Sequence, residues 1–218
     1  MEALCNSFVS LAEERDAFAL LCHLNESLAQ LREEGRAETG DAGWAPRASI
    51  VIYQEAFHRV INYGDCQFTI NGKRFLNHKE IDAINAERRA DVLREALRNG
   101  ASIESLLMHD IGRDAIRDSL IHQHNFENVK GEFGYPVMNG GPLCADFMVV
   151  EHVRPGDILV LASDGYPDLK QTLAATEQHL QELLSSDPLC IDANAQTKGL
   201  YPGNSSYDDR TYVRVLTE

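Results

Sequence analysis

The chain has 218 residues, enough for one compact core but too few for two independent domains of ordinary size. Lys and Arg number 20 and Asp and Glu number 34, so the formal net charge of −14 would repel phosphate backbones and anionic lipid headgroups. With 44% hydrophobic and 25% charged residues, the composition is that of a folded protein. These values argue against nucleic-acid and membrane partners and predict a single domain over residues 1–218.

Cysteine use and the N-terminal sequence favour a cytoplasmic protein. No run approaches the roughly 18 apolar residues of a membrane span, and the N-terminus is acidic where a signal peptide is basic. The five cysteines are scattered and form no CxxC pair, which indicates reduced thiols rather than disulfides or a zinc knuckle.

The N-terminal segment has a helical pattern. Apolar residues recur at spacings of three and four from Ala3 to about Arg32, which predicts an amphipathic helix. The glycines that follow, Gly35, Gly40 and Gly43, predict that the helix has ended and that a loop leads to Ser49.

Short strands follow from Ser49. A β-branched run over 50–53, a second apolar pair at 60–61, and Cys66, Phe68 and Ile70 alternating with polar neighbours are typical of successive antiparallel strands. Asn71-Gly72 is the dipeptide that a type I′ hairpin turn needs, because both turn positions take a positive φ. Two helices follow in the predicted order, one over 79–98 and another from 112 to about 124.

A loop and a strand–helix–strand pattern complete the chain. The Gly- and Asn-rich stretch 125–142 predicts an exposed loop, in which Gly140 and Gly141 are candidate substrate-binding positions, although a plain connection fits as well. Residues 158–162 predict a central strand buried on both faces. A helix over 169–184, with Pro167 in its first turn, and a terminal strand over 211–216 follow.

The candidate site consists of acidic residues at strand ends. Asp164 follows the apolar strand directly, and Asp208 precedes the terminal strand. Hard divalent cations prefer carboxylates and waters as ligands, so two such groups that converge would suit Mg²⁺ or Mn²⁺. Each motif taken singly also fits a plain turn, where Asp is favoured for its local hydrogen bonds.

Three motifs in this order resemble a known family. Tyr63-Gly64-Asp65, the segment GDILVLASDGYPDL around Asp164, and SYDDRTYVRV around Asp208 resemble the second half of the PP2C-like, metal-dependent (PPM) protein serine/threonine phosphatases, over about residues 49–216. Compared with that family, the segment from about 79 to 126 is interpreted as a helical insertion. The resemblance implies an α+β fold, a PP2C-like sandwich of two antiparallel β-sheets flanked by helices. It implies a site with two Mg²⁺ or Mn²⁺ ions. This site would catalyse the hydrolysis of phosphoserine or phosphothreonine in a phosphoprotein substrate. By the same resemblance, Asp164 and Asp208 are metal ligands and Asp65 helps to hold a further, weaker metal.

The sequence also departs from that family. A Glu-Asp pair, a phosphate-contacting Arg and a DGxxG-type turn have no counterpart before Ser49. We therefore expect an N-terminally incomplete domain with weak metal binding and with unpaired sheet edges open to association. The three explanations that remain are a start that lies upstream, a shortened relative without activity, and a half that a partner completes. The expected function is phosphatase activity if the site is completed; the alternative is a pseudophosphatase that acts as a regulatory, protein-interaction module.

Two further groups of residues have side chains that could bind a metal ion or a phosphate. His122 and His124 would point about 200° apart on a helix, which argues against a shared zinc ion. Arg113 and Arg117 lie one helical turn apart and could face a phosphate, but with neighbouring aspartates they are better interpreted as surface ion pairs.

Overall fold

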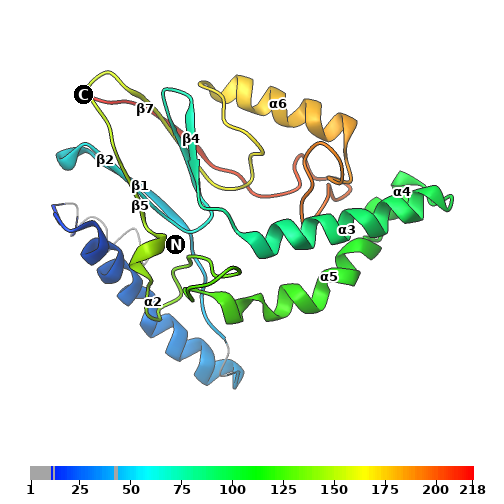
Figure 1. Cartoon of the computed structure of the whole chain (residues 1–218), viewed down its shortest axis with the longest axis horizontal. Coiled ribbons are helices and arrows are strands. Elements are labelled where there is room, and N and C mark those ends of the chain that lie inside the picture. Colours follow the sequence, from blue (N-terminus) through cyan, green and yellow to red (C-terminus); the bar gives the residue numbers. More distant parts are fainter. Residues whose placement is uncertain (1–10, 12, 42–43) are drawn as a thin grey trace.

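The computed structural model describes residues 11, 13–41 and 44–218 as two antiparallel sheets with helices around them (Figure 1). The strands are β1 (Ile50–Gln54), β2 (Arg59–Tyr63), β3 (Gln67–Ile70), β4 (Lys73–Leu76), β5 (Val149–His152), β6 (Ile158–Ala162) and β7 (Tyr212–Leu216). The α-helices are α2 (Ala17–Thr39), α3 (Glu80–Arg98), α4 (Ile103–Met108), α5 (Ile111–His122) and α6 (Leu173–Ser186). Short 3₁₀ turns are η1 (Glu55–Phe57), η2 (Gln123–Phe126) and η3 (Ala145–Phe147). The predicted α+β class with two antiparallel sheets is confirmed.

The two sheets pack face to face. Their strand orders are β1-β2-β5 and β4-β3-β6-β7. Side chains alternate between the faces of a strand, so Val60 of the first sheet meets Phe68 and Leu159 of the second in one buried cluster. This cluster is the centre of the sandwich.

Helices cover the two outer faces. Leu20 and Leu24 of α2 pack on Ile61 of the first sheet, and Leu180 of α6 packs on Val160 of the second. In Figure 1, α2 and α6 lie on opposite sides of the strands. The order of layers is therefore helix, sheet, sheet, helix, and β6 is buried on both faces as predicted.

The N-terminal helix differs from its prediction. It begins at Ala17, because the Asp16 carboxylate accepts hydrogen bonds from the first amide groups, and it continues past Arg32 to Thr39. The prediction that Gly35 ends it is wrong. A Cβ on Gly35 would lie 2.1 Å from the Trp44 ring, so the glycine is there for close packing within a helix. The predicted start, residues 3–10 and 12, lies outside the described residues.

Other local predictions have mixed outcomes. Asn71 and Gly72 have φ of 50° and 86°, which confirms the hairpin turn. The placement of Pro167 in the first turn of α6 is wrong, because the helix begins after Thr172, whose hydroxyl accepts from the Ala175 amide. The short helix α4 was not predicted.

The helices α3, α4 and α5 lie between β4 and β5, in the segment interpreted as an insertion. α3 and α5 lie side by side and extend away from the strands (Figure 1). Among the described residues before Ser49, the structure has α2 but no strand. At the other end of the sequence, the edge strand β7 exposes Val213 and Leu216. None of the helices in the described part of the chain is long and apolar enough to cross a membrane.

Candidate functional site

One end of the second sheet carries a pocket with a volume of about 600 Å³. The register explains its position: Gln67 at the start of β3 pairs with Ala162 at the end of β6, and Ala162 pairs with Tyr212 at the start of β7. The turns that precede β3, follow β6 and precede β7 must therefore meet at this end. The three predicted aspartates lie on these turns.

Asp65, Asp164 and Asp208 all line this pocket. The structure thus brings together the three positions that the sequence motifs singled out. Their assignment as metal ligands remains a prediction.

Asp65 is held by its neighbours. The Ser49 hydroxyl donates to the Asp65 carboxylate at 2.5 Å, and the Asp65 amide donates to the Ser49 oxygen at 3.2 Å. Gly64 has a φ of 111°, and a Cβ there would lie 2.3 Å from the Ser49 oxygen. Glycine at this position therefore permits the chain to bring Asp65 next to Ser49.

The turn with Asp164 is tied to the terminal turn. The Thr211 amide donates to the Ser163 hydroxyl at 2.9 Å, which continues the pairing of β6 and β7. A Cβ on Gly165 would lie 2.1 Å from the Asp209 carbonyl oxygen. The glycine of the Ser-Asp-Gly motif thus lets the two acidic turns approach each other.

Gln67 supports the same turn from the neighbouring strand. Its side-chain amide donates to the carbonyl oxygens of Ser163, at 3.0 Å, and Tyr166, at 2.7 Å. Asp164 therefore sits on a backbone that is held from both sides.

The pKa of Asp164 reflects its position among other acids. Desolvation by the surrounding protein and the charges of Asp65 and Asp208 raise its pKa to about 6, while the charge of Lys198 opposes this shift. The side chain is nevertheless exposed to the water of the pocket, so solvent screens part of this repulsion.

Lys198 was not among the predicted site residues, yet it lines the same pocket. Its Nζ lies 2.6 Å from Oδ1 of Asp208, and the two side chains are 30% and 25% exposed. The polar stretch around Lys198 has no periodic pattern, so the sequence offered no signal for this contact.

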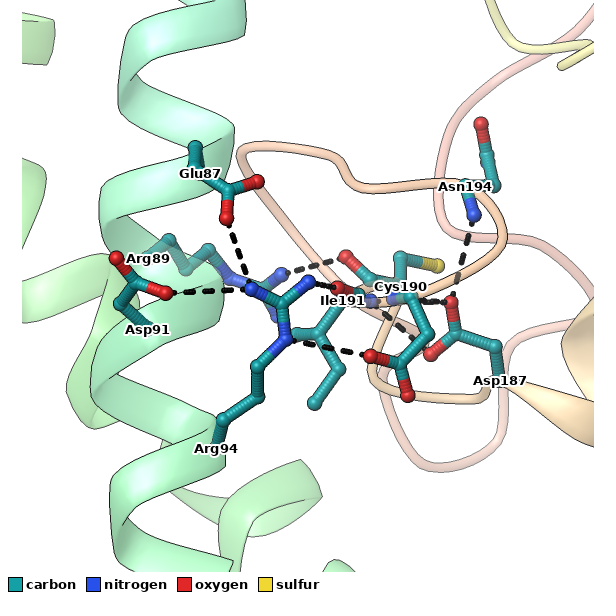
Figure 2. A network of polar contacts seen from close by, with 9 residues as sticks. Glu87, Arg89, Asp91, Arg94, Asp187, Cys190, Ile191 and Asn194 are labelled. Atoms are coloured by element: carbon teal, nitrogen blue, oxygen red, sulfur yellow. Dashed lines mark hydrogen bonds and ion pairs between the residues drawn. The ribbon is translucent and has the colours of Figure 1, made fainter.

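The loop that carries Lys198 is fixed by Arg89 of α3, which is fully buried (Figure 2). The Arg89 guanidinium donates to the carbonyl oxygens of Leu189 at 2.8 Å, Cys190 at 3.2 Å and Gln196 at 3.0 Å. It also forms a salt bridge with Asp110 at 2.8 Å. A planar group with five donors suits such a set of acceptors, because each partner meets a different N–H group.

Further contacts hold this loop. Arg94 of α3 reaches the Ile191 carbonyl, and the Asp187 carboxylate accepts from the amides of Ile191 and Asp192 (Figure 2). Arg113 of α5 donates to the Thr197 carbonyl at 2.7 Å, immediately before Lys198.

The arginine interpretation is half right. Arg117 forms the surface ion pair with Asp114 that was predicted. Arg113 instead lines the pocket and binds the Lys198 loop.

Gly140 and Gly141 lie against α2 instead of lining the pocket of the aspartates. The Gly140 amide donates to Asn25 at 2.9 Å, and the Asn25 side chain donates to the Gly141 carbonyl at 2.6 Å. A Cβ on Gly140 would lie 2.8 Å from the Ala29 backbone, so close packing on a helix accounts for this glycine. Their role in substrate binding remains a prediction without support from this geometry.

The two histidines lie on different elements, His122 at the end of α5 and His124 in η2. Nδ1 of His122 contacts the Asp118 carbonyl oxygen at 2.7 Å, and Nδ1 of His124 contacts the Ile121 carbonyl oxygen at 2.8 Å. That they share no zinc ion remains a prediction.

The donor types in the pocket fit a hard divalent cation, because three carboxylates line it. The placement of the side chains does not yet fit. Throughout the described residues, no three His, Cys, Asp or Glu side chains are close enough to hold one ion. Asp208 is also occupied by Lys198.

Comparisons with known proteins give only distant likenesses to solved structures. No protein-family model and no curated protein matches the chain. The solved phosphatase domain of the cell fate determinant SpoIIE from Bacillus subtilis (Mn presoaked) is similar at 14% identity and a TM-score of 0.33, over 100% of this chain and 73% of that one. PppA, a key regulatory component of T6SS in Pseudomonas aeruginosa, is similar at 16% identity and a TM-score of 0.33, over 84% of this chain and 65% of that one. Scores this low carry no functional argument.

Proposed function

We propose that this chain is a metal-dependent protein serine/threonine phosphatase domain, with its site completed by residues upstream or by a partner. The observation that supports this most is the position of Asp65, Asp164 and Asp208. They come from turns far apart in the sequence and line one pocket. These are also the positions that the resemblance to the PPM phosphatases marks as metal ligands.

The remaining lining of the pocket suits a phosphorylated peptide. Arg74 and Arg113 add positive charge to its wall, which would attract a phosphate ester to a chain of net charge −14. Lys79 also lines the pocket, paired with Asp82. A bound Mg²⁺ or Mn²⁺ would supply the activation of a water and offset the phosphoryl charge. The chain itself would contribute the carboxylates and the positively charged wall.

Hydrolysis of phosphoserine and phosphothreonine peptides tests the proposal. With the site completed, we expect phosphate release that depends on Mn²⁺. The substitutions Asp164→Asn and Asp208→Asn should each abolish this release. Asp209→Asn is the matched control, because Asp209 is an exposed neighbour to which the resemblance gives no ligand role. Turnover that survives Asp164→Asn would contradict the proposal.

The Lys198–Asp208 ion pair favours a second candidate, a pseudophosphatase that acts as a regulatory, protein-interaction module. Its ammonium group already neutralises one of the carboxylates that a metal would need. This function predicts neither turnover nor a rise in Tm when Mn²⁺ is added in excess. Mn²⁺-dependent turnover by the unmodified chain would exclude it.

A further inference from the structure

A second hollow adjoins the pocket of the aspartates. It has a volume of about 570 Å³ and lies between the end of α4, one side of α5 and the loop residue Tyr201. Its apolar lining is Met108, Leu120, Ile121 and Tyr201. We call this hollow the α5 groove.

Exposed apolar side chains converge in the α5 groove. Met108, Ile121 and Tyr201 are 75%, 57% and 46% exposed, and all three line this one hollow. Single exposed apolar side chains are common on protein surfaces, but a group of them around a hollow is typical of an interaction site. A methionine side chain has three rotatable bonds and adapts its shape to a ligand. The groove therefore suits a bulky apolar side chain.

The acidic side chains of the groove already have basic partners. Asp110 pairs with Arg89 at 2.8 Å. Asp114 contacts Arg117 and lies 3.3 Å from the His109 ring nitrogen. Because both carboxylates are compensated in this way, the groove favours an uncharged side chain over a basic one.

Arg113 joins the groove to the pocket of the aspartates, because it lines both hollows, as does Leu120. The Arg113 guanidinium donates to the neutral Thr197 carbonyl at 2.7 Å and forms no ion pair with any described residue. Its positive charge is therefore available to an anion that binds where the two hollows meet. A guanidinium group suits a phosphate in particular, since it can donate two parallel hydrogen bonds.

We propose that the α5 groove docks an apolar side chain of a phosphopeptide whose phosphate group binds Arg113. The inference rests on the proposed function for the choice of a phosphorylated ligand. Docking itself needs no metal ion, because it combines a guanidinium–phosphate contact with the burial of an apolar side chain. The groove thereby selects among peptides by a residue near the phosphorylated one.

The test is peptide binding to the full chain in metal-free buffer, measured by fluorescence anisotropy. The probes are labelled phosphoserine peptides in which a single Phe is moved through an otherwise alanine sequence. We expect Phe at one or more positions to raise the affinity roughly tenfold over the all-alanine phosphopeptide, because the aromatic ring leaves water on binding. The unphosphorylated form of the best peptide should bind roughly tenfold more weakly.

Variants assign the binding to the groove. Ile121→Glu and Met108→Glu should each remove the preference for Phe, because a carboxylate replaces part of the apolar wall. Two variants are made so that a folding defect in one, seen by circular dichroism, leaves the other to be measured. Leu31→Glu on α2 makes the same change of charge at an exposed residue outside both hollows and should keep the preference. Arg113→Gln should reduce the difference between phosphorylated and unphosphorylated peptides.

The outcomes separate the inference from the proposed function. The inference is overturned by equal affinity for the Phe and all-alanine phosphopeptides, by a preference for Phe that survives both Ile121→Glu and Met108→Glu, or by equally tight binding of the unphosphorylated peptide. Mn²⁺-dependent turnover of the same peptides by the completed site is measured separately. Turnover without a preference for Phe in binding overturns the inference alone, whereas docking in the groove without turnover contradicts only the proposed phosphatase activity.

Discussion

A Cβ atom on Gly165 would lie 2.1 Å from the carbonyl oxygen of Asp209, so the two acidic turns touch through their backbones. Because the obstacle is backbone and not a flexible side chain, alanine cannot be accommodated without moving a turn. We expect Gly165→Ala to reduce the free energy of unfolding by about 2–3 kcal/mol. Urea denaturation measures this loss.

Gly156→Ala is the control for that substitution. Gly156 has a φ of +89° and nothing within 4 Å of an added Cβ, so alanine there meets only backbone strain, about 1 kcal/mol. If Gly165→Ala costs no more than this control, the close approach of the turns is not what requires the glycine.

Arg89 should be the most sensitive residue of the Lys198 loop. Its side chain is 0% exposed and binds Asp110 together with three carbonyl groups. Removal of the charge in Arg89→Met leaves these partners buried, and we expect a loss of about 3–5 kcal/mol in the free energy of unfolding. Arg89→Lys should not restore it, because one ammonium cannot reach acceptors that the guanidinium fork reaches together.

Arg94 provides the matched comparison on the same helix. Its side chain is 34% exposed and its carboxylate partners lie near the surface. We expect Arg94→Met to cost less than about 1 kcal/mol by the same measurement. A larger loss for Arg94→Met than for Arg89→Met would show that burial does not determine the importance of these contacts.

The raised pKa of Asp164 predicts a pH dependence of stability. In the unfolded chain this carboxyl titrates near its usual pKa of about 4, whereas in the folded protein its pKa is raised to about 6. Between these values the folded state holds the proton more firmly, so this group makes the protein less stable as the pH rises from about 4 to about 6.

Asp164→Asn isolates this contribution. In metal-free buffer with a chelator, the variant should gain on the order of 1 kcal/mol relative to the unmodified chain between pH 4.5 and pH 7. We expect this gain in the free energy of unfolding to be smaller than a two-unit pKa shift would give, because water in the pocket screens the exposed carboxylate. A difference between the two chains that does not change with pH in urea denaturation would refute this prediction.

The terminal turn also depends on a contact with α6. The Arg210 guanidinium donates to both Glu177 oxygens at 2.8 Å, and the Tyr166 hydroxyl donates to the same carboxylate at 2.5 Å. We expect Glu177→Gln to cost about 1–2 kcal/mol and to speed amide hydrogen exchange in residues 208–211. Glu182→Gln on the same helix, where the exposed Glu182 bonds Gln178 one turn away, should change neither quantity.

Much of the sandwich could be predicted from local patterns. A β-branched run marks β1, alternating apolar residues mark β3, and the Asn71-Gly72 dipeptide favours a turn whose φ values are positive. An uninterrupted apolar run marks β6 as buried on both faces. The positions of the candidate aspartates could be predicted for the same reason, because each lies on a turn next to the end of one of these strands.

The structural role of a glycine, in contrast, depends on which residues pack against it in the folded chain. Gly35 has the composition signal of a helix end, but the Trp44 ring packs on it and α2 continues. Gly140 has the signal of a flexible loop, but it lies on the backbone of α2. Neither contact can be predicted from the residues on either side of the glycine.

The sequence by itself determined the strands, the hairpin turn and the places of the three aspartates, because periodicity and turn chemistry act over a few residues. Only the tertiary structure decided that Arg89 clamps the loop of Lys198 and that Lys198 pairs with Asp208. These contacts join side chains to partners on separate elements. Their energies depend on distance and burial in the folded chain, which no local pattern encodes.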